Sequence, residues 1–508
     1  MAHDIIVVLL VVLGIVVAYA LLSRRSRTTS PLPPSPKGHF LFKHLFMLPT
    51  SDEHIVYSDI SKQLNSDMIS FTVLGQVIVI LNSAESATDL LSKRGAIYSD
   101  RADLPMINDE RLAGWRRTTT FLPYGDRWKR QRAMTQAALS PSAGEELWPK
   151  MVKQARLSMQ RLLHFPNTAP GELQWMTAAT LLSSVYGYEA SYPRDRLVEI
   201  VETATTQLCE AAIPANFLVN TVPWLIHVPS WMPGASWKRK ADEWRAGKDK
   251  LINEPFEWTR SQIAANIAAP SILRTLLNRL ATNGAPKHGV EAEEDIVRWV
   301  IGTLYAAGAD TTVATMTTFV LAMVLHPEVQ RKAQEELDLV LGGRLPELSD
   351  RKDLPYLDAV MKEVMRWRSI VPMGVPHATS KEDFYRGFRI PKGSIVLANI
   401  WAISNNPSVY PEPQKFNPDR FLDPAVPPAP VFGYGRRECP GSHFAQSSFF
   451  VMASTFLTIF DATPTSGKPF PKATSSSNVL VAHPTPFHCT VTPRSDHHRR
   501  LIEDWVEH

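Results

Sequence analysis

The amino-acid sequence predicts a mainly helical globular protein with small β-sheets, preceded by one N-terminal transmembrane helix. Three patterns lead to this fold class. Residues 5–22 form an uncharged apolar run that is just long enough to cross a bilayer as a helix. From about residue 85 to residue 370, apolar residues recur mainly at helical spacing, interrupted by prolines and glycines. Strand-like alternation is confined to short segments, a hairpin at 68–81 with Gly75-Gln76 as its turn and a region at 384–398.

Composition argues against nucleic-acid binders and disulfide scaffolds. Of the 508 residues, 44% are hydrophobic and 20% are charged, which suits a large domain with a substantial core. The formal net charge of +4 gives no sign of a general nucleic-acid binder. The three cysteines, Cys209, Cys439 and Cys489, are odd in number and widely spaced, which is not the pattern of a disulfide framework. We therefore expect the body of the protein in a reducing compartment.

The charges that flank the apolar run at 5–22 indicate its orientation. Asp4 precedes the run and three arginines follow it within residues 24–27, so the positive-inside rule places the body of the protein in the cytosol. The alternative is a cleaved signal peptide, because an Ala-Tyr-Ala triplet ending at residue 20 resembles a cleavage site. The length of the run and the position of the arginines favour an uncleaved anchor.

We expect three parts along the chain. Residues 1–23 are the membrane anchor, residues 24–40 a basic and proline-rich linker, and residues 41–508 one catalytic domain. A connector at 222–240 carries three tryptophans among prolines and ends in a basic triplet. Such a composition suits either a packed loop or a membrane interface, and the anchor favours a second contact with the bilayer.

Cys439 lies in the segment FGYGRRECPG at 432–441, where its surroundings could activate a thiol. Pro440 is suited to the first turn of the apolar helix that follows, so Cys439 would lie at a helix N-terminus, where a thiolate is stabilised. Arg436 and Arg437 add positive charge nearby. A thiolate in this position could serve as a nucleophile or as a metal ligand, and a lone cysteine is more commonly just a buried core residue. Composition does not choose among these three.

The surrounding motif does choose. Five positions match the pattern F-x-x-G-x-R-x-C-x-G, which resembles the haem-binding loop of the cytochromes P-450; they are Phe432, Gly435, Arg437, Cys439 and Gly441. The resemblance implies the cytochrome P-450 fold, with haem b between a long central helix and the cysteine loop. It also implies that Cys439 is the axial thiolate ligand of the haem iron, a ligand that favours O–O cleavage. The two glycines would permit a tight turn and close approach of a flat ligand.

An apolar segment at about 296–326 contains AAGADTT at 306–312. It could be read as a second membrane span, but Asp310 and six threonines make a buried core helix the better interpretation. The small residues Ala307 and Gly308 would let a flat group approach the backbone. Asp310 and Thr311 resemble the family's acid–alcohol pair, which implies that they deliver protons during dioxygen activation. A mid-helix threonine more often only bonds back to its own helix.

Further stretches resemble the family in the expected order. Glu363 and Arg366, one helical turn apart in EVMR, resemble its E-x-x-R helix, and FNPDRF supplies Arg420. Taken alone, such a pair is usually a solvated surface pair. The resemblance implies instead that the three form a structural ion-pair network behind the haem.

The porphyrin carboxylates need cationic partners. Trp128 and Arg132 in YGDRWKRQR resemble the family's W-x-x-x-R pattern, which implies that both side chains reach a haem propionate; an ordinary basic, solvated helix is the alternative. His377 falls where the family often has a propionate-binding arginine or histidine. Arg437 completes the expected set.

The resemblance, strongest to fungal and microsomal members, implies a haem-dependent monooxygenase that inserts one oxygen atom of O₂ into a hydrophobic small molecule. Secondary metabolism and xenobiotic oxidation are the expected settings. No G-x-G-x-x-G fingerprint is present, so the electrons must come from elsewhere; the resemblance implies NADPH as their source, through a separate reductase. NADPH-cytochrome P-450 reductase is the implied partner, with cytochrome b5 as a further candidate, and the endoplasmic reticulum membrane is the implied location. Lys129, Arg130 and Arg436 would form a basic docking face.

Two other functions stay open from sequence. A haem-thiolate isomerase or dehydratase would use neither O₂ nor a reductase, but such enzymes often lack the acid–alcohol pair. A non-enzymatic haem carrier or sensor would leave that pair and the apolar pocket unexplained. That pocket is expected to be lined by five mainly apolar segments: 103–122, 207–222, 303–311, 370–376 and 480–485.

Overall fold

The structure is a computed structural model that describes residues 30–39, 43–49, 51–213, 216–282, 289–476 and 480–506. The expected membrane anchor at 1–23 lies outside the described residues, and so does the linker as far as residue 29.

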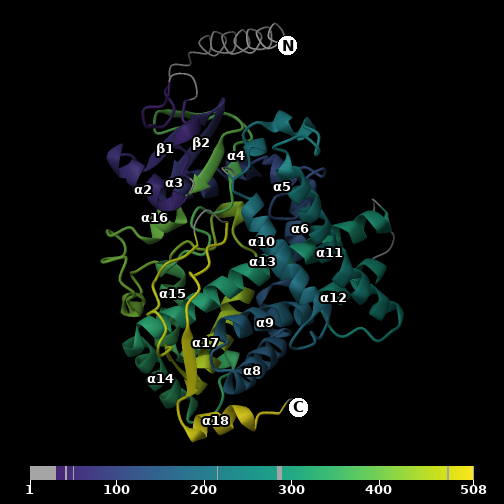
Figure 1. The fold of residues 1–508 in the computed structure, drawn as a ribbon, viewed down its shortest axis with the longest axis vertical. Coiled ribbons are helices and arrows are strands. Elements are labelled where there is room, and N and C mark those ends of the chain that lie inside the picture. Colours follow the sequence, from purple (N-terminus) through teal and green to yellow (C-terminus); the bar gives the residue numbers. More distant parts are fainter. Residues whose placement is uncertain are drawn as a thin grey trace.

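Helices make up most of the described fold, and the strands form small sheets (Figure 1). The helices are α2 Glu53–Gln63, α3 Ala84–Ala87, α4 Gly95–Tyr98, α5 Pro105–Asn108, α6 Asp126–Ala138, α7 Pro141–Glu145, α8 Trp148–His164, α9 Ala169–Leu181, α10 Arg196–Ala211, α11 Ser236–Ala264, α12 Ile272–Thr282, α13 Val290–Leu325, α14 Pro327–Leu341, α15 Pro355–Trp367, α16 Ile400–Ser404, α17 Ser442–Ile459 and α18 Asp496–Glu503. The strands are β1 Met68–Val73, β2 Gln76–Leu81, β3 Asp100–Arg101, β4 His377–Ala378, β5 Asp383–Tyr385, β6 Phe388–Ile390, β7 Ile395–Ala398, β8 Phe460–Pro464 and β9 Cys489–Pro493. The predicted mainly helical class is confirmed.

The largest sheet has the strand order β1-β2-β7-β4-β3. The predicted hairpin is present as β1 and β2, which pair antiparallel with Val73 opposite Gln76. Its turn is Leu74-Gly75 rather than Gly75-Gln76, because both turn residues have positive φ, 47° and 90°, as the tight turns that match strand twist require. Strand β7 pairs parallel to β2 and antiparallel to β4. The sheet thus brings His377 of β4 close to β3.

Helix α13 is the central element. It runs from Val290 to Leu325, longer at its start than the expected 296–326 segment, and it packs against α6, α9, α10, α11, α12 and α17. By length and composition it could cross a membrane, but 72% of its apolar window is buried inside the protein. The prediction of a buried core helix is therefore confirmed, since neighbouring helices cover the surface that lipid would otherwise meet.

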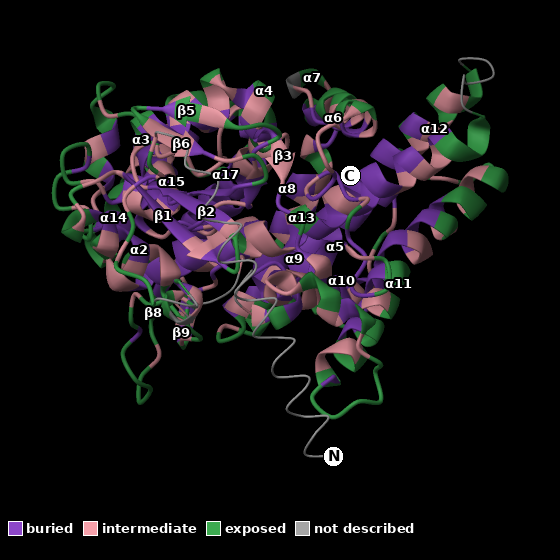
Figure 2. Cartoon of the chain, turned by 90° about the horizontal axis from the view of Figure 1, so that it is seen from above, coloured by how far each residue is buried: buried purple, intermediate pink, exposed green. Residues whose placement is uncertain are grey.

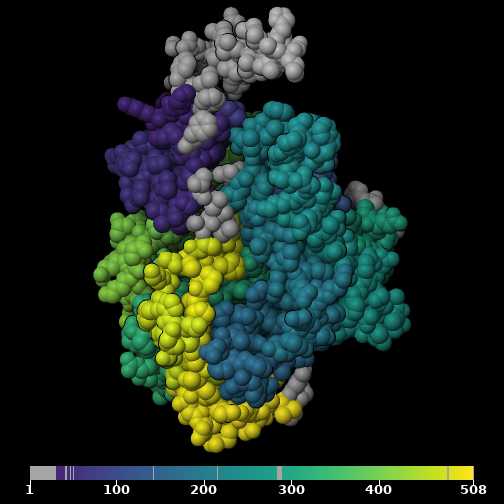
Figure 3. All heavy atoms as spheres, viewed as in Figure 1, coloured from purple at the N-terminus to yellow at the C-terminus, as the bar shows by residue number. Residues whose placement is uncertain are grey.

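Helix α13 also joins the two largest hydrophobic clusters of the described residues. Tyr305 belongs to the cluster that includes Phe71 of the hairpin, and Phe319 belongs to the cluster that includes Phe449 of α17. Viewed from above, buried residues run along α13 and its neighbours, while exposed residues lie around the rim (Figure 2). The C-terminal segment lies against α8 and α9 on the face shown in Figure 3, where α18 contacts α8.

The connector at 222–240 splits into a short 3₁₀ turn, Pro223–His227, and the start of α11 at Ser236. Two of its tryptophans are exposed, Trp224 at 67% and Trp231 at 77%. A loop packed against the core would bury such large side chains, so the packed-loop alternative does not describe these two tryptophans.

Candidate active site

The cysteine loop lies immediately before α17, which packs against α13. The Cys439 backbone N–H donates to the carbonyl of Phe432 over 2.8 Å, which closes the loop on itself. Helix α17 begins at Ser442, so Pro440 lies before its first turn, contrary to the sequence-based expectation. Cys439 nevertheless lies at the N-terminal end of α17, three residues before Ser442.

The Cys439 thiol is free and accessible, although protein surrounds the residue on its other sides. Burial raises its pKa, and the backbone N–H of Gly441 and the positive charge of Arg132 oppose that rise. The structure therefore corrects the expectation that Arg436 and Arg437 supply the favourable charge. Arg436 donates to the hydroxyl of Tyr124 instead. A bound metal ion would add the charge needed to hold the sulfur as thiolate.

The two motif glycines have different roles. Gly435 has a φ of +60°, and a Cβ there would collide with the carbonyl oxygen of Leu91, in the π-helical turn Thr88–Lys93. Its missing side chain therefore allows two backbone segments to touch. A Cβ on Gly441 would meet only ordinary contacts at 3.8 Å, so no steric need for glycine is visible there.

Three basic side chains lie together beside the large sheet: the partly buried Arg101 of β3 and the buried His377 of β4 and Arg437 of the cysteine loop. Burial lowers the pKa of Arg437 to about 10, and it lowers the pKa values of Arg101 and His377 well below their ordinary ranges. Among their mutual effects, Arg437 further lowers the pKa of Arg101, and both arginines lower that of His377. Asp100 is the carboxylate that partly offsets this charge.

The hydrogen bonds of this cluster go mainly to backbone carbonyls. Arg437 donates to the carbonyls of Ser99, Thr119 and Leu122, and Arg101 to those of Thr120 and Val375. His377 donates from Nδ1 to the carbonyl of Tyr98 over 2.8 Å. Neutral carbonyls orient a guanidinium but do not neutralise it, so the cluster retains the charge to attract an anion.

Arg101 was missed by sequence reasoning. It follows Asp100 in the stretch YSDRADLP, where nothing marks it as different from other arginines. Only the pairing of Arg101 with His377 across β3 and β4 brings it into the cluster.

Trp128 and Arg132 lie on α6, as the W-x-x-x-R spacing predicts. Trp128 is buried, and the guanidinium carbon of Arg437 lies 4.4 Å from its ring centroid. Arg132 is half-buried; burial lowers its pKa, and Cys439 opposes that shift. The structure thus places Trp128 and Arg132 beside the basic cluster and the thiol respectively.

On α13, Asp310 and Thr311 do not contact each other's functional groups. The Thr311 hydroxyl donates to the Ala307 carbonyl over 2.8 Å, as a mid-helix threonine usually does. Asp310 instead accepts from His483 Nε2 at 2.8 Å and from Cys209 Sγ at 3.3 Å.

The two small residues of α13, Ala307 and Gly308, differ in their surroundings. Ala307 is exposed. A Cβ on Gly308 would lie 3.1 Å from Leu181, so this glycine allows α9 to pack against α13. Of the two residues, Ala307 is therefore the one that leaves room beside the helix.

The Glu363–Arg366 pair is completely buried, with Arg366 Nε donating to Glu363 Oε2 over 2.6 Å. Arg420 also donates to Glu363, over 3.3 Å, and the backbone N–H of Asn417 donates to it over 2.8 Å. The three residues form the predicted ion-pair network, and the complete burial of Glu363 and Arg366 excludes the alternative of a solvated surface pair.

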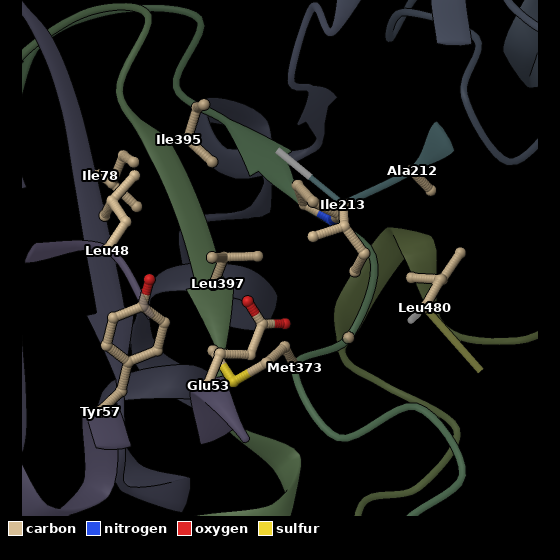
Figure 4. Close-up of a pocket in the computed structure, with 12 residues that line it drawn as sticks. Leu48, Glu53, Tyr57, Ile78, Ala212, Ile213, Met373, Ile395, Leu397 and Leu480 are labelled. Atoms are coloured by element: carbon tan, nitrogen blue, oxygen red, sulfur yellow. The ribbon is translucent and has the colours of Figure 1, made fainter. Parts of the chain in front are cut away.

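A cavity lies between α2, the large sheet and the end of α10 (Figure 4). It is lined by residues from three of the five predicted pocket segments, including Ile213, Met373 and Leu480. Its polar lining side chains are Tyr57 and Glu53, and the carboxyl of Glu53 points into the cavity in Figure 4. Burial raises the pKa of Glu53 to about 7. Segments 103–122 and 303–311 do not line it.

The expected docking cations are partly engaged within the protein. Arg130 pairs with the buried Glu293 of α13, which ties it to the core. Lys129 pairs with the exposed Asp126 over 3.1 Å. Of the three expected docking cations, Lys129 and Arg436 therefore stay available to a partner, and Arg130 does not.

The donor set fits a haem. A free, accessible thiol is the ligand type that a haem-thiolate iron takes. The cluster of Arg101, His377 and Arg437 fits the paired carboxylates of a porphyrin edge, which would supply the counter-charge.

Comparison with known proteins agrees with this geometry. The sequence profile of the family described as Cytochrome P450 matches residues 33–491. The chain is 36% identical over 501 residues to Cytochrome P450 monooxygenase 208 of Postia placenta, covering 97% of this chain and 96% of that protein. It is 38% identical over 483 residues to Cytochrome P450 monooxygenase ple1 of Rhodocybe pseudopiperita, covering 93% and 91%. It is 35% identical over 487 residues to the Tryptamine 4-monooxygenase of Psilocybe cyanescens, covering 93% and 94%.

Proposed function

From the premise that this chain belongs to the cytochrome P450 family and is a haem-containing monooxygenase, we propose that it oxidises a hydrophobic small molecule of secondary metabolism with Cys439 as its iron ligand. The observation that carries the proposal is the free thiol of Cys439, three residues before α17, whose pKa the Gly441 backbone and the charge of Arg132 lower against the effect of burial. Both effects favour the thiolate over the thiol.

The residues around Cys439 would hold the group in one orientation. Arg101, Arg437 and His377 would bind the haem carboxylates, with Trp128 and Arg132 completing that side of the site. Ala307 of α13 would leave room on the opposite face. Haem b bound in this way supplies the O₂ chemistry, to which a thiolate ligand contributes electron density. Asp310 and Thr311 would handle the protons.

The substrate class rests on the mainly apolar residues of the five predicted pocket segments, which favour a hydrophobic molecule such as a terpenoid, an acyl chain or a polyketide. The cavity of Figure 4, at about 30 Å³, has room only for water and is not the substrate site. The name of one relative, Tryptamine 4-monooxygenase, adds an indole amine to these candidates.

Family membership implies a reductase and a small-molecule substrate as partners. We propose an NADPH-dependent reductase, with cytochrome b5 as a further donor, docking near the exposed Lys129 and Arg436. Attachment to the endoplasmic reticulum membrane through residues 1–23, with the catalytic domain in the cytosol, is part of the proposal. Exposed Trp224 and Trp231 support a second membrane contact, since tryptophan favours the interface.

The test is the absorption spectrum of the reduced, carbon monoxide-bound protein. Wild type should show the red-shifted Soret band of a thiolate-ligated haem, and Cys439→Ala should lack it. Cys489→Ala, which removes a buried thiol elsewhere, should keep it. A histidine-type band in folded wild type, or a red-shifted band in Cys439→Ala, would overturn the assignment.

A further inference from the structure

The carboxylate of Asp310 is held from two sides by residues distant in sequence. Its Oδ1 lies 2.8 Å from Nε2 of His483, and its Oδ2 accepts from the thiol of Cys209 over 3.3 Å. Cys209 lies on α10, Asp310 near the middle of α13, and His483 in the segment 480–485. Three elements thus converge on one acid.

The backbone reinforces this convergence. The N–H of Leu480 donates to the carbonyl of Cys209 over 3.4 Å, and the N–H of Ala482 donates to the carbonyl of Ile370 over 2.8 Å. His483 is further held by Ser476, whose hydroxyl accepts from the His483 N–H over 3.0 Å. The imidazole is therefore aimed at Asp310 by its own segment.

The three side chains differ in access to water. Cys209 is buried, the Asp310 side chain is 16% exposed, and the His483 side chain is 36% exposed. Burial raises the pKa of Cys209, and the charge of Asp310 raises it further. Cys209 is therefore a hydrogen-bond donor that keeps its proton, which leaves His483 as the neighbour of Asp310 that can exchange protons with solvent.

We propose that His483 is the positioning residue through which solvent protons reach Asp310, with Cys209 fixing the second carboxylate oxygen. The inference rests on the proposed role of Asp310 and Thr311 in proton handling. Water protonates His483 at Nδ1, the Nε2 proton passes to Asp310 Oδ1, and the imidazole is left neutral with its proton on Nδ1. No oxidant or reductant is consumed.

This transfer also explains how Asp310, held by His483 and Cys209, can pass a proton on. Before the transfer, an imidazolium and a carboxylate attract each other; after it, both groups are neutral and that attraction is gone. The protonated carboxyl is then free to turn on its side-chain torsions toward the adjacent Thr311. The simpler alternative is that the contact only fastens segment 480–485 to α13.

The variant His483→Gln separates the two roles. Its amide can still donate to Asp310, so a purely structural contact survives, but it cannot carry a proton. The kinetic measurement mixes pre-reduced protein with oxygen and excess reduced reductase, in H₂O and in D₂O, and follows the return of the ferric absorption spectrum. His488→Gln changes an exposed histidine of the same C-terminal segment and is the matched control.

We expect His483→Gln to slow this return on the order of tenfold or more, with a larger D₂O effect, because general acid–base groups contribute at least this much. The double variant with Asp310→Asn should be no slower than Asp310→Asn alone, since both act on one route. An unchanged rate in His483→Gln, or effects that multiply in the double variant, would overturn the proposal.

A second measurement does not depend on turnover. Alkylation of Cys209 by iodoacetamide, read by mass spectrometry of its peptide, reports whether the three-way contact is intact. His483→Gln should leave this labelling unchanged, and Asp310→Asn should increase it because the acceptor that raises the Cys209 pKa is weakened. Increased labelling in His483→Gln would assign the residue a structural role instead. If wild type lacked the thiolate-type carbon monoxide spectrum, the proposed function would fail. The labelling of Cys209 does not depend on that spectrum, so the two failures can be told apart.

Discussion

The partly buried Arg101 and the buried Arg437 lie close enough that the charge of Arg437 lowers the pKa of Arg101. Two arginines distant in sequence are thus held together where like charges repel. His377 lies in the same field. Their arrangement is understandable as a site prepared for an anion, because a carboxylate would turn repulsion into attraction on both sides.

Removing Arg101 should therefore weaken haem binding. We expect Arg101→Leu to lose haem affinity by roughly ten- to a hundredfold, the range of about 1.5–3 kcal/mol for a hydrogen bond to a charged group. Haem transfer to apomyoglobin, followed by absorbance, measures this loss. Arg116→Leu, which removes a half-exposed arginine paired with the exposed Asp103, should behave as wild type. Equal haem retention by both variants would contradict the assignment of Arg101.

The buried network should be the most sensitive ion pair to break. Glu363 and Arg366 have no exposed side-chain surface, so Glu363→Gln leaves an arginine buried without its counter-charge. We expect destabilisation of about 3–5 kcal/mol, measured as a lowered urea midpoint of the Soret signal. Asp59→Asn breaks an exposed i,i+3 pair with Lys62 and should change stability by less than about 1 kcal/mol. Similar effects from the two substitutions would show that the buried pair is not structural.

The two glycines of the cysteine motif offer a matched comparison. Gly435→Ala would drive a Cβ into the backbone of Leu91 at a positive φ, so we expect poor folding and little bound haem. Gly441→Ala meets only contacts at 3.8 Å and should keep the thiolate-type carbon monoxide spectrum. Haem content per folded protein, read from the Soret and 280 nm absorbances, distinguishes them. The reverse order would refute this division of roles.

Glu53 should make stability depend on pH in an unusual direction. Burial raises its folded-state pKa from 4.5 to about 7, so between these values the folded state binds more protons than the unfolded state. Stability from this group is therefore fully present below about pH 4.5 and is lost as pH rises through about 7, by an amount on the order of 3 kcal/mol.

The variant Glu53→Gln tests this dependence. Its melting temperature relative to wild type should rise between pH 5 and pH 8, because the glutamine has no charge to bury. Asp52→Asn, at the preceding exposed position, is the control and should show no comparable pH effect. A difference between Glu53→Gln and wild type that is constant over this pH range would rule out a buried, titrating carboxyl.

Much of the site could be predicted because its signals are local in sequence. The cysteine loop falls within ten residues, the Trp128–Arg132 pair within one helical turn, and the Glu363–Arg366 pair within another. Spacing alone places such residues on one face, whatever the rest of the chain does. The threonines and aspartate of α13 likewise distinguish a core helix from a membrane span.

Other features required the tertiary structure. Arg101 enters the basic cluster only because β3 pairs with β4, and Glu53 meets an apolar cavity only because α2 lies against the sheet. Asp310, identified from its own motif, is held by Cys209 and His483, which are 101 and 173 residues away. The sequence by itself determined the cysteine motif and the helices, since those depend on neighbours along the chain. The protonation states and partners of the charged groups depend on burial and on distant residues, so the packing of the folded chain decided them.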